Sequence, residues 1–420
     1  MAVPVGWSAT AKLAAYFWPK TNCMRHMLNI RPLALFSNPW RRWYPFLLLA
    51  VLCGCSKDRD PAKDYGPFLQ QTLDRALQAD PQVRNAVLLV ESPKLRLNWK
   101  GASGLANPAA GTVMTPDQPF RSASIGKHTL AALVLKLSEE GRLSLDDKLE
   151  QHLPADIIDD IHVLDGISYG RTITLRQLLN HTSGLDDYFF GFINEADKAD
   201  GLPYMLELLL DEPDKFWTPL ETIAYYKQYL QPRFAPTRGY LYSDTNYQLL
   251  GLVVEKVTNL PLHQAYQQWL FAPLQMRDTY VEFYEQPRQA VSHSFFQDVD
   301  ITNYKSYSAD WGGGGLITTT EDLAKFARAL ANNSYFRRPG TKQAMFTWVP
   351  TGEEGSSYGL GTQKMVVAGE ELIGHTGATG SVLYYWPAKD VIISYTINQV
   401  APTTNTDETI LLPIIQELKK

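Results

Sequence analysis

Ser124 and Lys127 have the types and spacing for nucleophilic catalysis. They belong to Ser124-Ile125-Gly126-Lys127, which opens an apolar segment with helical periodicity. A serine in the first turn of a helix lies near unpaired backbone N–H groups and the positive end of the helix dipole, and both favour a developing oxyanion. A desolvated lysine beside a second cation can lose its proton near neutral pH and then accept the serine proton. The alternative is a capping serine with a solvated lysine, but the helix that follows is too apolar to be exposed.

Tyr242, in Tyr242-Ser243-Asp244, is a second candidate. An apolar face between residues 249 and 254 follows it, so we expect the tyrosine on a loop before a helix that is anchored in the core. A neighbouring ammonium group can favour the phenolate, which makes Tyr242 a candidate general base or proton shuttle. Because the chain has 22 tyrosines, a core tyrosine with a hydrogen-bonded hydroxyl is the alternative.

A third candidate is the segment 374–378, Gly-His-Thr-Gly-Ala, between two predicted strands. Its glycines would let a substrate backbone lie along a sheet edge. An ordinary hairpin loop would have a similar composition, so this segment alone does not establish a site.

Predicted strands near both ends of the chain enclose a long helical middle. Apolar residues at 68–77 indicate a first helix of about 15 residues, a helix runs from Ser124 to Gly141, and Thr174 and Thr319 open further helices. Strands are expected at 87–90, 95–99, 359–367, 381–386 and 391–397, before a final helix from 407 or 413 to 420. This order predicts an α+β fold (α/β sandwich): an antiparallel sheet flanked by N- and C-terminal helices, with an all-helical subdomain inserted roughly at 122–335 and the active site in the cleft between them.

Together the three candidate segments, in this order, resemble the serine β-lactamase and penicillin-binding-protein superfamily, whose pattern is S-x-x-K, a Tyr or Ser motif and K-T-G. The resemblance extends from about residue 66 to 417 and includes LLNHTSGL at 178–185 and GGGGLITTTEDLAKF at 312–326. It is closest to the branch of class C β-lactamases, D-alanyl-D-alanine carboxypeptidases and related esterases, whose members carry Tyr-x-Asn and Lys- or His-x-Gly.

The resemblance implies a catalytic role for each matched residue. Ser124 would be the acylated nucleophile and Lys127 its proton partner. Tyr242 would protonate the leaving group and then activate water for deacylation. The backbone N–H groups of Ser124 and Ala378 would form the oxyanion hole.

The resemblance also implies that Asp244, His375, Thr376 and Gly377 bind substrate, with His375 and Thr376 holding a substrate carboxylate or tuning Tyr242. Two of these residues depart from the family pattern. Asp244 replaces the usual asparagine, so a possible donor becomes an acceptor whose charge would hold the neighbouring lysine protonated. His375 replaces the lysine usual in β-lactamases and is a weaker anchor for a carboxylate.

The sequence therefore predicts a serine hydrolase that acts through an acyl-enzyme on Ser124, with β-lactamase or D-alanyl-D-alanine carboxypeptidase-type amide hydrolysis of a peptidoglycan-like or β-lactam substrate. Carboxylesterase activity with the same serine is the alternative, followed by a non-catalytic penicillin-binding-like sensor. An α/β-hydrolase would need G-x-S-x-G, whereas residues 122–126 are Ser-Ala-Ser-Ile-Gly. No cofactor is expected, and no cluster of metal ligands is evident in the sequence.

Four other features have structural interpretations. His181 is expected to close a helix and order a turn, and the glycine run at 312–315 to form a tight turn that lines the cleft. Trp311 belongs either to the substrate pocket or to the core. The aromatic segment 187–233 forms either a lid or part of the helical core.

Residues 1–55 have the features of an export leader: six basic residues, no acidic ones and all three cysteines of the chain. Arg41-Arg42 precedes an apolar run at 46–52 that is too short to span a bilayer, an order typical of a signal peptide. Leu52-Cys53-Gly54-Cys55 resembles a bacterial lipobox, which predicts lipidation of Cys55. An ordinary secretory signal or an uncleaved anchor is the alternative.

We accordingly expect a polar tether at 56–65, a hydrolase domain at 66–420 and an exported lipoprotein anchored to the membrane on the periplasmic side. The chain has a net charge of -5, and because its leader is basic the body is more acidic still. Such a body is a poor surface for phosphates, so nucleic acid is not an expected partner. The expected partners are a small-molecule or peptidoglycan-derived substrate and the membrane, with the protein itself a monomer.

Overall fold

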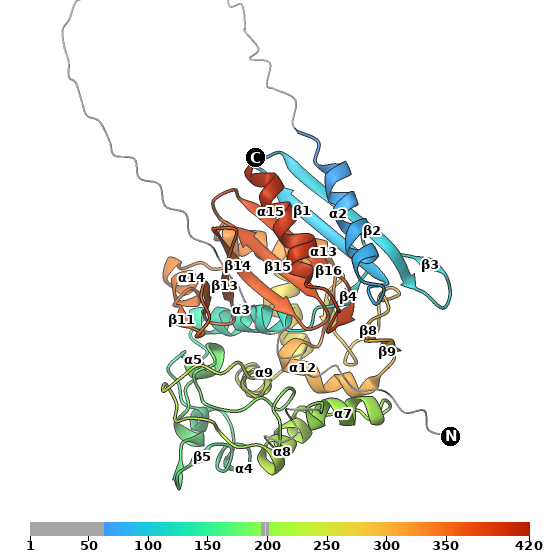
Figure 1. Cartoon of the computed structure of the whole chain (residues 1–420). Helices are drawn as coiled ribbons and strands as arrows, with labels where there is room; N and C mark the ends of the chain where they lie inside the picture. The colour runs from blue at the N-terminus through green and yellow to red at the C-terminus, as the bar shows by residue number, and fades with distance from the viewer. Residues whose placement is uncertain (1–62, 195–197, 199–200) are drawn as a thin grey trace, which may run out of the picture.

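A nine-stranded antiparallel sheet forms the upper part of the molecule in the computed structural model, which describes residues 63–194, 198 and 201–420 (Figure 1). The strand order is β11-β12-β13-β14-β15-β16-β1-β2-β3. The strands are β1 Asn85–Ser92, β2 Leu97–Asn107, β3 Thr112–Val113, β11 Val349–Pro350, β12 Ser356–Tyr358, β13 Gln363–Val367, β14 Glu370–Gly377, β15 Ser381–Trp386 and β16 Val391–Thr396. Strand β1 therefore pairs with β2, its neighbour in sequence, and with β16 from the other end of the chain.

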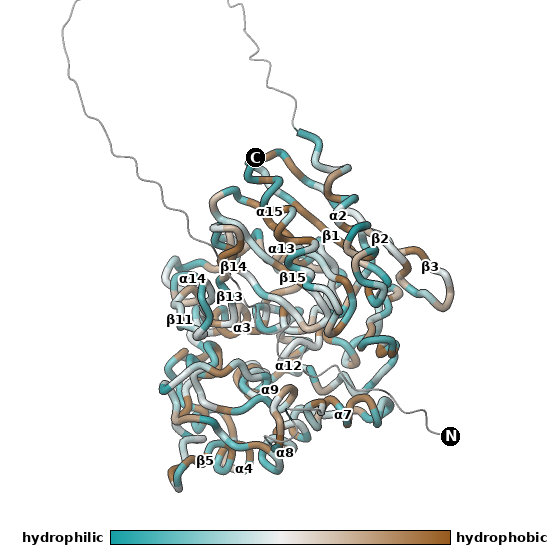
Figure 2. The backbone as a smooth tube through the Cα atoms, in the orientation of Figure 1, coloured by the Kyte–Doolittle hydropathy of each residue, from teal (hydrophilic) through white to brown (hydrophobic). Residues whose placement is uncertain are grey.

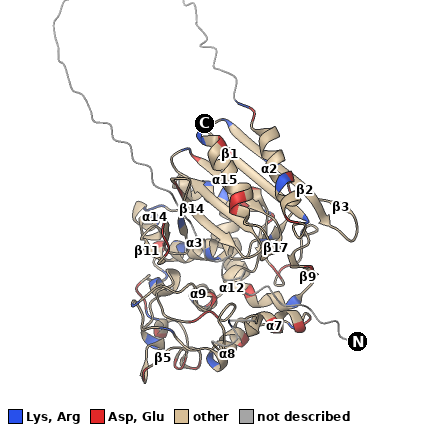
Figure 3. Cartoon of the chain, viewed as in Figure 1, with Lys and Arg blue, Asp and Glu red and all other residues tan. Residues whose placement is uncertain are grey.

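Helices cover both faces of this sheet because its side chains alternate between them. Leu88 and Val90 of β1 pack in one apolar cluster with α2, Gly66–Ala79, and α15, Leu412–Lys419. Val87 and Leu89 pack in a second cluster with α3, Ile125–Glu139, and α13, Thr320–Ala331. Figure 2 shows the hydropathy of the residues along these strands and helices, and Figure 3 shows where their Lys, Arg, Asp and Glu residues lie.

The remaining helices lie mainly on the α3 side of the sheet, in the lower part of Figure 1. They are α4 Ala155–Ile158, α5 Leu175–Leu179, α7 Tyr204–Asp211, α8 Pro219–Tyr229, α9 Asp244–Thr258, α10 Leu262–Tyr266, α11 Ala272–Leu274, α12 Trp311–Gly314 and α14 Pro339–Met345. Short strands accompany them, namely β4 Phe120–Arg121, β5 Val163–Leu164, β6 Ile167–Ser168, β7 Tyr280–Val281, β8 Phe295–Phe296, β9 Val299–Asp300, β10 Leu316–Thr318 and β17 Gln399–Val400. The predicted fold class is confirmed, and the inserted region contains short strands as well as helices.

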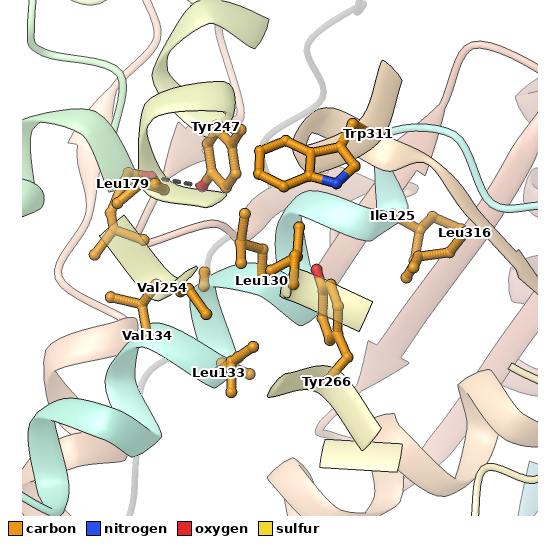
Figure 4. Packing of buried hydrophobic residues seen from close by; sticks show 14 of the residues in the cluster. Ile125, Leu130, Leu133, Val134, Leu179, Tyr247, Val254, Tyr266, Trp311 and Leu316 are labelled. Carbon is orange, nitrogen blue, oxygen red and sulfur yellow. Dashed lines mark hydrogen bonds between the residues drawn. The ribbon is translucent and has the colours of Figure 1, made fainter. Parts of the chain in front are cut away.

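Helix α3 is buried along nearly its whole length and forms the centre of the larger core (Figure 4). Leu130, Leu133 and Val134 are fully buried, and the cluster around them includes side chains of α9 and α12. Trp311 is one of these core residues, with 4% of its surface exposed. A helix buried on all sides places its first turn, with Ser124, at a fixed point between the sheet and the helical region.

The leader lies outside the described residues, and with it Cys55 and most of the predicted tether. Tyr65 at the end of the tether is already buried, and Lys63 pairs with Glu417 of α15 at 2.7 Å. Among the helices that the structure describes, none combines the length and apolarity needed to cross a membrane.

Candidate active site

Ser124 lies at the N-terminus of α3, where the chain turns sharply into the helix. The preceding residue, Ala123, has a φ of 46°, in the left-handed region that residues other than glycine rarely adopt. Strain of this kind is concentrated at functional sites. Ser124 is partly exposed although Ala123 and Ile125 are buried, so the turn presents a single hydroxyl group to the cleft.

Two glycines let α12 lie directly against this turn. A Cβ atom on Gly126 would lie 2.6 Å from Gly314 Cα, and one on Gly314 would lie 2.3 Å from the carbonyl oxygen of Ala123. Side chains at either position would force the backbones apart. The glycine run at 312–315 was expected to form a tight turn but belongs to the short helix α12 and its C-cap. Gly314 and Gly315 line the cleft beside Ser124, as expected.

Lys127 is fully buried, and its ammonium group has three acceptors. Nζ donates to Ser124 Oγ at 2.9 Å, to Asp244 Oδ1 at 2.5 Å and to Gly313 O at 2.9 Å. An ammonium group carries three protons, and each has a partner here. In this geometry the ammonium group of Lys127 donates to the serine hydroxyl and is paired with the carboxylate of Asp244.

Asp244 and Asp310 both lie close to Gly313. A Cβ atom on Gly313 would lie 2.3 Å from Asp244 Oδ1 and 3.0 Å from Asp310 Oδ1. Burial, opposed by the charge of Lys127 and assisted by that of Asp244, raises the pKa of Asp310 to about 7. The site therefore holds a carboxyl group that changes its charge near neutral pH.

His181 holds the loop that carries Tyr242. Leu241 N donates to His181 O at 3.0 Å, and Ser243 N donates to His181 Nδ1 at 3.1 Å. The imidazole ring also lies against Tyr242, with 4.4 Å between ring centres. Because burial lowers the pKa of His181 well below its ordinary value, the ring is neutral and accepts the Ser243 N–H. His181 follows the end of α5, Leu175–Leu179, and beyond the turn expected there it holds the loop of Tyr242.

Tyr242 lies beside Lys127, whose Nζ is 5.0 Å from the ring centre. Its hydroxyl makes no hydrogen bond of ordinary geometry with the described residues. Burial and the charge of Asp244 raise the pKa of Tyr242 well above 10, and the nearby hydroxyl of Ser124 offsets this only in part. The expectation of a favoured phenolate is wrong, because burial and neighbouring carboxylates outweigh one ammonium group. Tyr242 is a neutral phenol that can donate a proton.

His375 is fully buried in β14. Its Nδ1 lies 2.6 Å from Thr376 O and its Nε2 2.9 Å from Tyr358 Oη. The carbonyl can only accept, so Nδ1 carries the proton and Nε2 accepts from the tyrosine; burial lowers the pKa of His375 well below its ordinary value. A direct contact with a substrate carboxylate is inconsistent with this burial. The other expected role, tuning Tyr242, is open to His375 through Tyr358, whose ring centre is 6.0 Å from that of Tyr242.

The last residues of β14 extend beyond β13, which pairs with β14 only as far as Gly374. Thr376 N and Oγ1 both donate to the Gln363 side chain, at 3.2 and 3.3 Å. Gln363 therefore takes the edge position that a substrate backbone was expected to occupy at Thr376. Gly377 serves close packing, because a Cβ atom there would lie 2.6 Å from Ser122 O.

This close packing places Ala378 in the same pocket lining as Ser124. Neither Ser124 N nor Ala378 N donates to another residue within the described ranges. Two free N–H groups in one pocket have the composition of an oxyanion hole, where each donor contributes about 3 kcal/mol to the lowering of the barrier.

The pocket beside Ser124 combines an apolar wall with buried charges. Arg121 is the one cation among the described residues that line it, and Glu282 binds its Nε and Nη2 at 2.8 and 2.9 Å. Arg121 also donates to the backbone carbonyls of Ile301 and Thr302. The apolar wall comes from several elements and consists of Phe189, Phe190, Leu206, Phe296 and Val400. Part of the segment 187–233 thus lines the site, while Tyr226 of the same segment is core.

Sequence reasoning missed Asp310, Asp187 and the pair of Arg121 with Glu282. Asp187 is buried, and burial together with the charge of Asp244 raises its pKa well above its ordinary value. One signal for Asp310 was present, an acidic residue just before a run of glycines. No group of side chains in the described part of the chain has the composition and spacing of a metal site.

Comparison with known proteins gives a consistent result. The sequence model of the Beta-lactamase family matches residues 73–413. Penicillin-binding protein 4* of Bacillus subtilis is 25% identical over 308 residues, 69% of this chain and 62% of that protein, so the chain spans less than two thirds of it. A putative D-alanyl-D-alanine carboxypeptidase of Escherichia coli is 24% identical over 412 residues, 82% of this chain and 88% of that protein.

A solved structure is similar over nearly its whole length. The D-stereospecific amidohydrolase from Streptomyces sp. has a TM-score of 0.69 and 27% sequence identity, and the match covers 83% of this chain and 98% of that one. This solved structure therefore shares its fold with the matched part of the chain.

Proposed function

The chain belongs to the Beta-lactamase family, and from this membership and the geometry of the site we propose that it is a serine hydrolase that forms an acyl-enzyme on Ser124 and cleaves amide bonds. The observation that carries the proposal is the contact of Ser124 Oγ with the fully buried ammonium group of Lys127 at 2.9 Å. In the alternative interpretation, a capping serine beside a solvated lysine, the ammonium group would be exposed to water, whereas Lys127 is fully buried. Two buried hydrogen bonds, to Asp244 and to Gly313 O, instead hold the ammonium group of Lys127 at the hydroxyl group of Ser124.

The serine proton needs an acceptor, and Lys127 is charged. Asp244 can accept a proton from Lys127, because its Oδ1 accepts a buried hydrogen bond of 2.5 Å from Nζ. In a buried pair, transfer of the proton to the carboxylate leaves two neutral groups and avoids desolvated charges. As Ser124 attacks the carbonyl carbon, Lys127 gives one proton to Asp244 and takes the serine proton, so Oγ becomes the acyl oxygen and the carbonyl oxygen becomes the oxyanion.

Collapse of the tetrahedral intermediate requires a proton for the leaving group. Tyr242 is suited to this step because its phenol remains neutral at working pH. Its proton passes to the leaving nitrogen or oxygen as the acyl-enzyme forms. The phenolate that remains can take a proton from water, whose oxygen then attacks the acyl carbon. As the bond to Ser124 breaks, Lys127 returns a proton to Oγ and regains its own from Asp244, so every group recovers its starting state.

The similarity to the solved D-stereospecific amidohydrolase, at 27% identity, supports the proposal that the donor is an amide and not an ester. The putative D-alanyl-D-alanine carboxypeptidase of Escherichia coli supports the same bond type. The pocket does not favour a β-lactam or a peptide with a free carboxylate. Arg121 is paired with Glu282, and His375 is buried and neutral.

The test is intact-mass measurement of the purified protein after exposure to a fluorophosphonate, a fluorescent penicillin and a p-nitrophenyl ester, followed by turnover of a p-nitroanilide and the ester. We expect a covalent adduct on Ser124 and no adduct in Ser124→Ala. Labelling that persists in Ser124→Ala would refute the proposal. A penicillin adduct without turnover of any donor would instead indicate a sensor, and turnover of the ester alone an esterase.

A further inference from the structure

We propose that the pocket beside Ser124 binds a protonated amine of the acyl donor, close to the scissile carbonyl, and an apolar substituent of the same donor. The inference rests on the proposed hydrolysis through Ser124 and narrows its substrate class to aminoacyl amides and esters. It is carried by two carboxylates that face the pocket without sufficient partners.

Asp310 is the first of them. It is the N-cap residue of α12, but its side chain makes no capping hydrogen bond, and no hydrogen bond or ion pair joins it to any other described residue. Asp310 is one of the residues that line the pocket. An acidic side chain placed at a helix start without capping it, and facing a pocket, is available to a ligand.

Asp244 is the second. Only 1% of it is exposed, and it lines the same pocket. One oxygen binds Lys127, while the other is buried without a hydrogen-bond partner among the described residues. A buried acceptor without a partner costs about 1 to 3 kcal/mol. A cation in the pocket would offset that cost through the negative potential of both carboxylates.

The charges around the pocket leave a surplus of acid. Arg121 is neutralised by Glu282, and Lys127 by Asp244, so Asp310 has no counterion of its own. A substrate carboxylate placed here would meet a net negative charge. An ammonium group would neutralise the charge of Asp310. It would also bring three N–H donors to the carboxylate oxygens of Asp310 and Asp244 that lack a hydrogen-bond partner.

The position of Asp310 fixes where the amine lies on the donor. A Cβ atom on Gly314 would lie 2.8 Å from Asp310 Oδ2 and 2.3 Å from the carbonyl oxygen of Ala123, the residue before the nucleophile. The carboxylate is thus adjacent to the nucleophile turn, so the amine belongs near the scissile carbonyl. The apolar wall around Phe189 and Phe296 fits an apolar substituent on the same part of the donor.

The experiment compares kcat/KM for phenylalanine p-nitroanilide, of each configuration, with that for 3-phenylpropanoyl p-nitroanilide, which lacks only the amine. We expect the wild-type protein to prefer an amine-bearing donor at least tenfold, and Asp310→Asn to lose most of that preference. Asp165→Asn is the matched control, since Asp165 is exposed in the turn between β5 and β6. Its ratio should equal that of the wild type.

A second measurement needs no catalysis. Calorimetry on the Ser124→Ala protein compares phenethylamine with 2-phenylethanol, and we expect the amine to bind at least tenfold more tightly, an advantage that Asp310→Asn removes. A wild-type preference of onefold or less, or a preference that survives Asp310→Asn in both measurements, would overturn the amine site. If Ser124 is not labelled by a fluorophosphonate but phenethylamine binds through Asp310, the proposed hydrolysis fails and the amine site stands.

Discussion

Asp244 determines what Lys127 can do, because a carboxylate in hydrogen-bond contact both keeps a proton on the lysine and can accept one from it. An asparagine at this position could do neither. Its side-chain oxygen would still accept from Nζ, but no proton could pass to it. The aspartate therefore changes the proton path of the site more than its shape.

Asp244→Asn tests this path. We expect kcat to fall by about 100-fold or more for donors with and without an amine, since general acid-base steps contribute 10²- to 10⁴-fold. KM should change little for the donor without an amine, because the amide has the volume of the carboxylate, and should rise for the amine donor, because one of the two carboxylates of the proposed amine site is lost. Steady-state kinetics on both p-nitroanilides provides the measurement. A variant more active than the wild type at pH 7 would show that Asp244 only holds Lys127 protonated.

Asp310 gives the preference for an amine a pH dependence. Its carboxyl group gains a proton below its pKa of about 7 and then no longer attracts an ammonium group. The ratio of kcat/KM for the amine donor over its deamino analogue should therefore fall about tenfold between pH 7.5 and 5.5, and remain flat in Asp310→Asn. The charged and titratable groups that face Asp310 are Lys127, Asp244, Glu282, Arg121, Tyr188, Tyr242 and Tyr307. A ratio that rises toward acid pH would assign the effect to another of these groups.

The same carboxyl group links stability to pH. Its pKa in the folded protein lies above the ordinary value of 3.8, so its favourable contribution is complete below pH 3.8 and is lost as the pH rises through about 7. Asparagine has no such loss. At pH 8, Asp310→Asn should raise the free energy of unfolding by about 2 kcal/mol relative to the wild type and raise Tm accordingly. At pH 4.5 the gain should be much smaller. In differential scanning calorimetry, the Tm of Asp165→Asn should differ from that of the wild type by the same small amount at both pH values.

At the scale of elements, the nucleophile turn depends on the close approach of α12 to α3. This approach also sets where Gly313 O meets Lys127 Nζ and where Asp310 meets Asp244. A single methyl group between the two backbones would disturb all three contacts together, because each is fixed by the position of α12.

Gly314→Ala introduces that methyl group. The new Cβ would lie 2.3 Å from the Ala123 carbonyl oxygen, so we expect a loss of about 2 kcal/mol of stability, as for other overpacked sites, and a fall in kcat of more than tenfold. Gly340→Ala is the control, because a Cβ atom there has nothing within 4 Å. Chemical denaturation and p-nitroanilide turnover measure the two effects. Wild-type turnover in Gly314→Ala would show that the packing is not needed for the site.

Local patterns in the sequence predicted the elements well because short-range physics decides them. Thr174 accepts from Gln177 N at 3.3 Å as its capping box requires, and the strand expected at 381–386 is β15. The contact of Ser124 with Lys127 follows from helical spacing alone.

Contacts between distant segments could not be predicted in this way. Asp310 meets Asp244 only because α12 packs beside α9, and Arg121 meets Glu282 across 161 residues. The segment around His375 has the composition of an exposed loop, but Tyr358 from β12 covers its ring. Composition cannot distinguish a buried histidine from an exposed one when the covering residue comes from another strand.

At the scale of the whole molecule, the described chain begins with α2 and ends with α15, which lie on one face of the sheet, away from the nucleophile turn (Figure 1). We propose that the protein is an exported lipoprotein attached through Cys55. A tether leaving this face would leave the cleft open to substrate.

The mature protein is therefore expected to begin at a lipidated Cys55 and to partition with membranes. Cys55→Ser should release it into the soluble fraction without loss of hydrolysis, because every residue placed in the site lies between Arg121 and Val400. Mass spectrometry of the N-terminus, with and without globomycin, makes the measurement. Processing that is insensitive to globomycin, or a different mature N-terminus, would contradict lipidation and leave the enzyme assignment intact.

The place of β1 between β2 and β16 determines when the molecule can fold. Leu88 of β1 pairs with Tyr395, so the sheet cannot be completed until almost the entire chain has left the ribosome. Pairing between such distant segments is slow, since a long loop must close before any contact repays the lost entropy. During synthesis the chain consequently remains without its central sheet, in a state that can still be threaded through a narrow channel or captured by a chaperone.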